Sequence, residues 1–298
     1  MRVDFSTGDV FAVARPHPRK AAAPLVAAPL DPASSRINGL VVTPLDASGG
    51  YDDRVYVGSS YFDGFIDVKH NGYLTGIGQC SGTLFAANTV VTASHCVIGT
   101  SGAAASVSFS PRRRSSSSTP FGTGTSSWAE WETAYTSHNC HVSYSWSPCV
   151  YHDFMIVGFS GGSFSPDPGY AGFAWYGDSD ITSGYDRTTG YPDCGQSGIV
   201  GCVTSGPYRD YYCGNTHPSL SGGSTSNAWP YSDGANPIFR NGCDFTPGQS
   251  GSSVREQAST AYILSLMIFI DCSDAGCVHS ADGPRINSTV FNWMNSYR

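Results

Sequence analysis

The chain has 298 residues, a length that an all-β barrel protein can reach as one unit. Its net charge of −7 and pI of about 5.5 do not favour nucleic-acid binding, and no segment holds the ~20 consecutive apolar residues of a membrane span. Glycine (35) and tyrosine (17) are abundant while charged residues make up 13%, which favours short strands joined by turns. We expect no nucleic-acid or membrane partner, no cofactor and a monomer.

The cysteine content indicates an oxidising compartment. Ten cysteines is an even and high number, and proteins in reducing compartments seldom keep so many. The first residues, Met1–Phe5, carry an acid where the apolar run of a signal peptide would begin, so no signal peptide is visible. The cysteines nevertheless predict a secreted, extracellular protein from which a signal segment has been removed; a cytosolic form is the alternative.

The first 36 residues differ from the rest in composition. They hold no cysteine and are rich in alanine and proline, and such a stretch is expected to bury little surface. We interpret residues 1–36 as a pro-segment or N-terminal arm, and residues 37–298 as the globular domain.

From about residue 54, short apolar runs alternate with turn residues, the pattern of an all-β protein. The predicted strands are Val55–Val57, Thr83–Phe85, Thr89–Ala93, Met155–Phe159 and Ile263–Ile270. The final stretch, Ile286–Tyr297, has apolar spacing that predicts one short amphipathic helix.

A histidine follows the third of these strands and lies next to a cysteine. Cys80 lies 16 residues before Cys96, and a disulfide between them would fix the direction of His95. Closing a loop of this size stabilises a fold by about 3 kcal/mol in the chain-entropy model. On its own, this pattern also suits a histidine with a purely structural role.

Two serines lie in the sequence Gly-Gln-Ser-Gly, at Ser197 and Ser250. A serine between glycines can sit on a tight turn with its hydroxyl exposed and backbone N–H groups converging beside it. The two copies cannot both be catalytic, and each copy alone is weak evidence for a nucleophile. Upstream, Asp153 begins a buried-looking run, Asp153–Val157, where a carboxylate could orient a histidine; its alternative is a carboxylate at a strand end.

These motifs resemble those of the chymotrypsin-like serine proteases. TASHC at residues 92–96 resembles the family's histidine motif, and PGQSGS at 247–252 resembles its nucleophile motif. The glutamine before the serine, with GYP at 190–192, is closest in style to the bacterial glutamyl-endopeptidase branch. The resemblance covers residues 37–298 and implies two six-stranded antiparallel β-barrels packed together, with a short C-terminal helix.

The resemblance implies a serine endopeptidase with His95, Asp153 and Ser250 as catalytic triad. Ser250 has 48 residues after it, which is typical of the family, whereas Ser197 has 101, which fits the family poorly. The N–H groups of Gly248 and Ser250 would form the oxyanion hole, and the substrates would be proteins or peptides. Alternatives are an esterase using the same triad, and an inactive homologue that acts as a binding module.

Two departures from the family concern activation and specificity. The junction Arg36–Ile37 resembles a zymogen activation site, but uncharged Gln249 stands where trypsin-like zymogens carry an aspartate that pairs with the new N-terminus. Asp244, Phe245 and Ser265 are the candidate substrate-binding residues. Asp244 would select basic residues or hold the nucleophile loop, and Phe245 makes glutamate preference doubtful.

The cysteines and histidines allow several assignments. Short loops favour the disulfides Cys80–Cys96, Cys140–Cys149 and Cys272–Cys277, and the remaining four cysteines allow three pairings, of which we select Cys194–Cys202 and Cys213–Cys243. His138, Cys140, His141, Cys149 and His152 crowd one segment, but their spacing fits no familiar zinc site, and we predict no metal.

Overall fold

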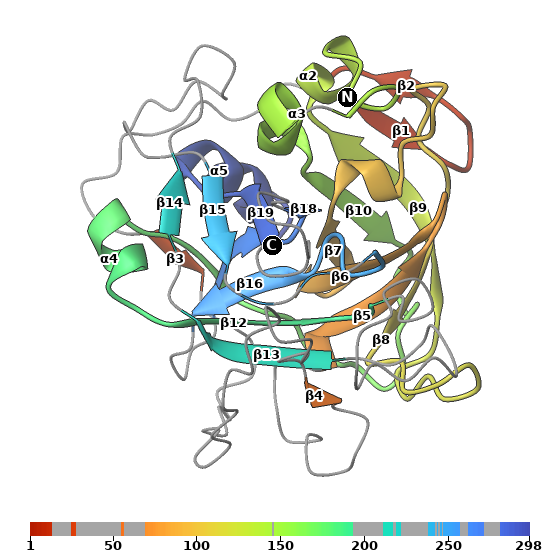
Figure 1. Ribbon diagram of the computed structural model, residues 1–298. Coiled ribbons are helices and arrows are strands. Elements are labelled where there is room, and N and C mark those ends of the chain that lie inside the picture. The colour runs from red at the N-terminus through yellow and green to blue at the C-terminus, as the bar shows by residue number, and fades with distance from the viewer. Residues whose placement is uncertain are drawn as a thin grey trace.

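Short strands and helices build the molecule, as the composition predicts. The computed structural model describes residues 1–13, 25–27, 55–56, 69–144, 146–192, 211–216, 219–221, 238–241, 243, 245, 247–256, 262–270 and 281–298. Figure 1 shows two groups of strands, one on the right from the first part of the chain and one on the left that comes mainly from the second half.

Six antiparallel strands of the first half close into a barrel. Neighbouring strands pair in the order β10-β7-β6-β5-β8-β9, and β9 pairs with β10 to complete the ring. The strands are β5 (Asn71–Thr75), β6 (Gln79–Ala86), β7 (Thr89–Thr92), β8 (Ser108–Pro111), β9 (Gly124–Trp131) and β10 (Met155–Phe159). Closure leaves no free edge among these six strands, so they hold the residues between them in fixed positions.

The N-terminal residues pack on this barrel. Strand β1 (Arg2–Asp4) pairs antiparallel with β9 and with β2 (Val10–Phe11), and Val3 is buried. The N-terminal ammonium of Met1 donates to the carbonyl of Trp131 over 2.8 Å. Residues 1–13 therefore bury more surface than their composition predicts. The role of residues 1–36 as a pro-segment or arm remains a prediction.

Strands of the second half, joined by two short strands from the first 56 residues, form two sheets. The larger has the order β3-β11-β17-β16-β12-β13-β4 and the smaller β14-β15-β19-β18. Their strands are β3 (Leu25–Ala27), β4 (Val55–Tyr56), β11 (Phe173–Trp175), β12 (Asp186–Gly190), β13 (Tyr211–Thr216), β14 (Ser219–Ser221), β15 (Ile238–Asn241), β16 (Ser253–Glu256), β17 (Ile263–Leu266), β18 (Phe269–Ile270) and β19 (Ala281–Pro284).

The prediction of two closed six-stranded barrels is therefore wrong for the second barrel, which is not closed among the described residues. The outer side of β13 pairs with β4 and not with the smaller sheet. Strand β17 meets the chain after β19 through one isolated bridge, between Ser265 and Arg285. With one bridge instead of a ladder, the two sheets face each other without joining into a ring.

The long predicted strand Ile263–Ile270 is two strands because its backbone changes partner. Residues of β17 pair with β16, and the N–H of Met267 still donates to the backbone carbonyl of Ser252. The next N–H, of Ile268, donates to the backbone carbonyl of Asp282 on β19, and β18 then pairs with β19. A continuous apolar run thus crosses from one sheet to the other.

The helices are short. The predicted C-terminal helix is α5 (Ser288–Asn295), whose N-cap Asn287 accepts a hydrogen bond from the N–H of Val290 at 2.8 Å. The others are α2 (Thr133–Ser137), α3 (Trp146–His152) and α4 (Asp178–Thr182). These have five to seven residues, too few for the sequence to show a helical period. Among the residues that the structure describes, no helix is long and apolar enough to cross a lipid bilayer.

Helix α5 attaches the end of the chain to the first barrel. The carboxylate of Glu130, on β9, is buried and accepts hydrogen bonds from Trp293 Nε1, at 2.6 Å, and from the hydroxyl of Tyr297. The ring of Tyr297 also stacks on Trp128 of the same strand. A buried carboxylate on strand β9 thus holds helix α5 and the residues that follow it against the first barrel.

Three predicted disulfides are present. They are Cys80–Cys96, Cys140–Cys149 and Cys213–Cys243. Cys213 lies on β13 of the larger sheet and Cys243 follows β15 of the smaller one, so this disulfide ties the two sheets together. The predicted pairs Cys194–Cys202 and Cys272–Cys277 lie outside the described residues.

Candidate active site

His95 and Asp153 form a hydrogen-bonded pair at one end of the first barrel. His95 lies in a 3-10 turn directly after β7, and Asp153 lies between α3 and β10, which pairs with β7. His95 Nδ1 is 2.6 Å from Asp153 Oδ2, and the backbone N–H of His95 donates to Oδ1 at 2.9 Å. A carboxylate only accepts hydrogen bonds, so this contact keeps a proton on Nδ1 and leaves Nε2 able to accept one.

Burial and the neighbouring carboxylate have opposite effects on the pKa of His95. Burial alone lowers the pKa of His95, but the negative charge of Asp153 and the hydrogen bond to it raise the pKa above its ordinary value. Asp153 is fully buried, whereas 30% of the His95 side chain is exposed. The imidazole therefore meets solvent on the side away from its carboxylate.

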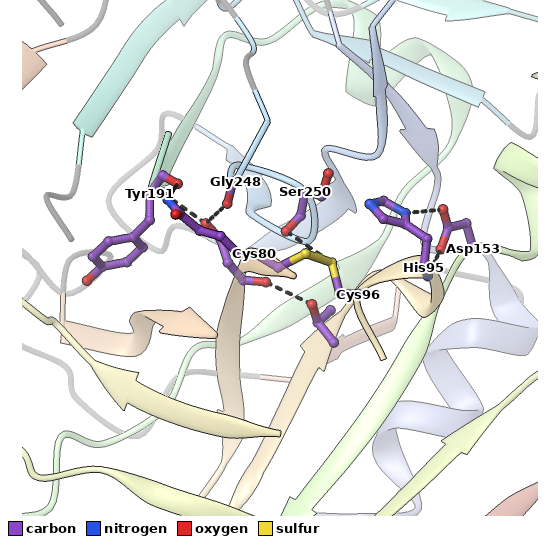
Figure 2. The surroundings of a disulfide bond; sticks show 10 residues. Cys80, His95, Cys96, Asp153, Tyr191, Gly248 and Ser250 are labelled. Atoms are coloured by element: carbon purple, nitrogen blue, oxygen red, sulfur yellow. Dashed lines mark hydrogen bonds and ion pairs between the residues drawn. A yellow bond between two sulfur atoms is a disulfide. The ribbon is translucent and has the colours of Figure 1, made fainter. Parts of the chain in front are cut away.

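Ser250 lies on the side of the His95 ring opposite Asp153 (Figure 2). Its carbonyl accepts a hydrogen bond from the N–H of Ser81 at 2.8 Å and lies 3.7 Å from the Sγ of Cys96. Because Cys96 follows His95 in the chain and is bonded to Cys80, the Cys80–Cys96 disulfide lies beside both the serine and the histidine. The structure thus brings His95, Asp153 and Ser250 together.

Ser81 holds the turn that carries Ser250, and the sequence motifs did not identify it. Its hydroxyl is buried, donates to the carbonyl of Gly248 at 2.9 Å and accepts from the N–H of Tyr191 at 2.9 Å. Together with its own N–H on Ser250, Ser81 fixes both ends of the Gly248–Ser250 turn. Its position next to Cys80 was the available sequence signal, but its partners lie more than 100 residues away.

Glycine is required on both sides of Ser250. Gly248 and Gly251 have φ of +92° and +82°, which residues with a side chain rarely adopt. A Cβ on Gly251 would lie 2.3 Å from Thr92 Oγ1 and 2.4 Å from the carbonyl of Ser81. Within the described part of the chain, neither the N–H of Gly248 nor that of Ser250 donates to a protein acceptor. The turn therefore presents two N–H groups that can bind an oxygen atom.

Gln249 is buried inside this turn. A Cβ on Gly190 would lie 3.3 Å from Cγ of Gln249, so the glutamine packs beneath the end of β12. An uncharged side chain at this position gives an inserted N-terminus no ion-pair partner there, as the sequence predicts. The junction Arg36–Ile37 and the alternative serine, Ser197, lie outside the described residues.

A cavity of about 450 Å³ opens beside His95. Its walls come largely from the loop after His95 and the segment between α2 and α3, with apolar side chains that include Ile98, Val142 and Ile268. Val142 is 64% exposed, so it stands at the rim. An apolar cavity next to a polar centre is typical of a site for a ligand.

Two tyrosines in the wall of this cavity lie close to Asp153. Tyr144 presents its ring edge-on to His95, with 6.1 Å between ring centroids at 82°. Burial and the charge of Asp153 hold the pKa of the Tyr144 phenol well above its ordinary value. Burial and the same charge also raise the pKa of Tyr135, on α2. Neither tyrosine lies in a motif that the sequence analysis identified.

The predicted substrate-binding residues are buried or outside the described residues. Ser265 is fully buried and donates to the carbonyl of Pro284 at 3.0 Å. Phe245 is 3% exposed and packs in the core of the second half. Asp244 is not among the described residues. Burial gives Ser265 and Phe245 structural contacts, and contact with a substrate remains a prediction for all three.

Groups that could have suggested a metal are held by other contacts. Cys80, His95 and Cys96 lie close enough for a common ion, but both sulfurs belong to a disulfide. In the segment before Asp153, the Cys140–Cys149 disulfide takes two further sulfurs, and His152 Nδ1 lies 2.6 Å from Glu132 Oε2. The chemistry available at this site is thus proton transfer by an imidazole and attack by a hydroxyl.

Comparisons with known proteins identify the fold. The sequence matches no family model and no curated protein. Among solved structures, it is similar to protease Anisep from Arthrobacter nicotinovorans, with 18% identity over 77% of this chain and 96% of that chain and a TM-score of 0.55. A Glu endopeptidase structure has 18% identity over 83% and 97% of the chains, with a TM-score of 0.57.

A thermostable serine protease, AL20 from an extremophilic microorganism, has 17% identity over 78% of this chain and 98% of that chain, with a TM-score of 0.54. The resemblance that the histidine and serine motifs predict is therefore confirmed at the level of the fold. The chain has the trypsin-like fold of serine proteases, and a Glu endopeptidase is among the proteins that share it.

Proposed function

We propose that this protein is a serine endopeptidase whose catalytic triad is His95, Asp153 and Ser250. The observation that carries the proposal is the 2.6 Å contact between His95 Nδ1 and Asp153 Oδ2, with Ser250 on the opposite side of the imidazole (Figure 2). The trypsin-like fold supports it, because the proteins that share it here include several proteases. Peptides and proteins are the substrates that this fold favours.

In the proposed reaction, Ser250 Oγ forms a bond to the carbonyl carbon of the scissile peptide while its proton moves to His95 Nε2. The C–N bond then breaks, and the imidazolium returns the proton to the leaving amine, which leaves an acyl ester on Ser250. Water, deprotonated by the same imidazole, hydrolyses the ester and restores the serine. Asp153 keeps His95 in the required tautomer and stabilises its positive charge during each transfer.

The carbonyl oxygen becomes negative as the tetrahedral intermediates form. The N–H groups of Gly248 and Ser250 would donate to that oxygen, and their lack of a protein acceptor within the described chain supports this role. Loss of one such donor typically lowers turnover by ~10²–10³. The positive φ of Gly248 turns the backbone into the conformation in which these two groups are presented.

We also propose that the protein acts outside the cell. The three described disulfides support an oxidising compartment, where such bonds persist. Activation by cleavage after Arg36, and selection of the substrate by Asp244 or Phe245, belong to the same proposal and await measurement.

The decisive experiment compares the parent protein with Ser250→Ala and Ser197→Ala. Each is incubated with a denatured protein and, separately, with a fluorophosphonate that labels activated serines. We expect cleavage and labelling by the parent and by Ser197→Ala, and neither by Ser250→Ala. The residues before each cut, mapped by mass spectrometry, then give the specificity. If Ser197→Ala lost activity and Ser250→Ala kept it, the nucleophile would be Ser197 and the proposed triad would be wrong.

If the parent protein neither cleaves nor labels, it is tested again after residues 1–36 have been removed. Continued inactivity would favour the binding-module alternative. Labelling without cleavage of any peptide, together with hydrolysis of simple esters, would favour the esterase alternative.

A further inference from the structure

We propose that the N-terminal hairpin (residues 1–13, with β1 and β2) is a permanent part of the protease domain and stays bound to it after cleavage at the Arg36–Ile37 junction. The composition of this segment predicts a pro-segment or arm that buries little surface, but the hairpin is paired and packed on the first barrel. Its retention rests on the proposed function and extends it, because it states which residues the active protease contains.

Strand β1 completes the pairing of β9 on the side opposite β10 (Figure 1). On that side β8 pairs with the first two residues of β9, and β1 pairs with residues 128–130. Backbone hydrogen bonds extend this pairing at both ends. The N–H of Phe5 donates to the carbonyl of Ser127 at 2.8 Å, and the N–H of Trp131 donates to the carbonyl of Met1 at 2.9 Å. Loss of the hairpin would therefore leave the second half of β9 as an exposed strand edge.

Side chains of β1 contact both faces of this sheet. Val3 is 6% exposed and belongs to the main hydrophobic core, while the guanidinium of Arg2 lies 4.0 Å from the ring centre of Trp128. Successive side chains of a strand point to opposite faces, so these two contacts lie on opposite sides of β1. The turn to β2 is closed by Asp4, whose carboxylate accepts from the N–H of Ser6 at 2.9 Å and from its hydroxyl at 2.6 Å. The hairpin is therefore a folded element with its own turn.

The hairpin also backs the loop that follows His95. Gly99 and Thr100 line the cavity beside His95. Residues 102–104 of the same loop line a second cavity, of about 380 Å³, which the hairpin also lines. The N–H of Gly99 donates to the carbonyl of Ala103 at 3.0 Å, so the two parts of the loop are connected. Loss of the hairpin would open the second cavity and loosen the wall of the first.

A second contact attaches the same segment to the other half of the molecule. Strand β3 (Leu25–Ala27) pairs antiparallel with β11 of the larger sheet. Residues 1–36 thus pair with strands of both halves. A fragment that makes two contacts at once binds more tightly than either contact alone allows. The segment holds no cysteine, so its retention depends on these non-covalent contacts.

The test cuts the folded protein and measures whether the fragment stays. A recognition sequence for a site-specific protease is inserted between Arg36 and Ile37, and the purified full chain is cut and passed over a size-exclusion column under native conditions. We expect residues 1–36 to elute together with the rest of the chain, and to separate from it only in denaturant. Mass spectrometry of each peak identifies the fragments.

Val3→Asp and Val10→Asp form a matched pair of variants. Val3 is buried, whereas Val10, its partner across the hairpin, is 54% exposed and can keep a charge in water. After cutting, Val3→Asp should lose the fragment and Val10→Asp should retain it. Loss of the fragment should raise KM more than it lowers kcat, because the loop beside His95 loses its support. A chain that lacks residues 1–36 should therefore bind substrate more weakly than the cut parent.

Hydrogen exchange on the uncut parent gives a second readout that needs no variant. The amides of Phe5 and Trp131 should exchange slowly, because pairing of the hairpin with β9 holds both. Fast exchange of both amides contradicts the proposal.

Two results of the cutting experiment would also overturn it: release of residues 1–36 from the cut parent under native conditions, and equal retention of the fragment by Val3→Asp and Val10→Asp. Neither chromatography nor hydrogen exchange needs catalysis. If the protein hydrolyses no substrate, the proposed function fails, while the retention of the hairpin is still decided by these two measurements.

Discussion

At His95, two opposing effects set the proton affinity that catalysis would use. The pKa lies above 6.5 because the charge of Asp153 and its hydrogen bond outweigh burial. The base in the proposed reaction is the neutral imidazole, so kcat/KM should fall as pH decreases through a value above 6.5. A pH profile of kcat/KM with a peptide substrate measures this acid limb.

Asp153→Asn removes the charge that raises this pKa. The acid limb should then move to lower pH, and the rate at neutral pH should fall by ~10⁴, because an amide can hold the wrong imidazole tautomer. Glu132→Gln is the control, since Glu132 contacts His152 and not His95. An acid limb at or below 6.5 in the parent would contradict the electrostatics described here.

Ser81 should matter to the activity although it contacts no reacting atom. Ser81→Ala removes the hydroxyl that joins Gly248 to Tyr191, while the N–H on Ser250 remains. Leaving these buried backbone groups unpaired should cost about 1–3 kcal/mol of unfolding free energy. We expect kcat to decrease more than KM changes, because the turn with Gly248 loses its anchor.

Kinetics and thermal unfolding of Ser81→Ala check this expectation. Ser137→Ala, on an exposed turn of α2, is the control that removes a serine hydroxyl without affecting the site. If both variants unfold and turn over like the parent, Ser81 does not hold the nucleophile turn.

At this scale, the sequence predicts what is local and misses what is distant. His95 and Ser250 stand in motifs whose neighbours, Cys96 and Gly251, carry the signal within a few positions. Ser81 acts through partners 110 and 167 residues away. Tyr144 is one tyrosine among 17, and only the folded loop places its ring beside His95. No spacing rule connects such residues, because their contact depends on how strands and loops pack.

Among the elements, helix α5 depends on the residue that caps its N-terminus. Asn287 is buried and caps the helix through Val290, so Asn287→Ala should lower the unfolding free energy by about 1 kcal/mol. Denaturant unfolding measures the difference. Asn295→Ala, at the exposed end of the same helix, is the control and should have little effect. Equal stability of the two variants would show that the cap contributes nothing.

Element boundaries were predictable where pairing follows the chain. Met155–Phe159 has the bounds that its apolar pattern predicts, because β10 is buried and paired along its whole length. Ile263–Ile270 does not, because two sheets share it. A run of apolar residues reports burial but not the identity of the partner strand. Helices α2 and α4 have five residues each, which is too few for the repeated apolar spacing by which a helix is recognised in a sequence.

For the molecule as a whole, the Cys213–Cys243 disulfide compensates for the open second barrel. It joins two sheets that share one isolated bridge, and it closes a loop of 30 residues. Replacing both cysteines by serine should cost about 3–4 kcal/mol, against about 2.6 kcal/mol for the shorter loop of Cys140–Cys149. Thermal unfolding of the two double variants compares these values. A larger loss for Cys140–Cys149 would contradict the role given to the longer loop.

The sequence predicted the fold class but not whether the second barrel closes. The histidine and serine motifs indicated a double-barrel fold because they resemble those of one family. Whether the second ring closes depends on single pairings such as that of β13 with β4, and Val55–Tyr56 carries no mark of its partner. For the same reason the packing of Val3 on the barrel was not apparent from an alanine- and proline-rich segment.

The shared carboxylate of Glu130 has a consequence for the order in which a ribosome delivers the chain. Strand β9 emerges long before Trp293 and Tyr297, which supply its hydrogen bonds. Until those last residues arrive, burying Glu130 leaves an uncompensated charge inside the first barrel, which is costly. The first half of the nascent chain should therefore stay incompletely folded until helix α5 has been synthesised and can pack on the first barrel.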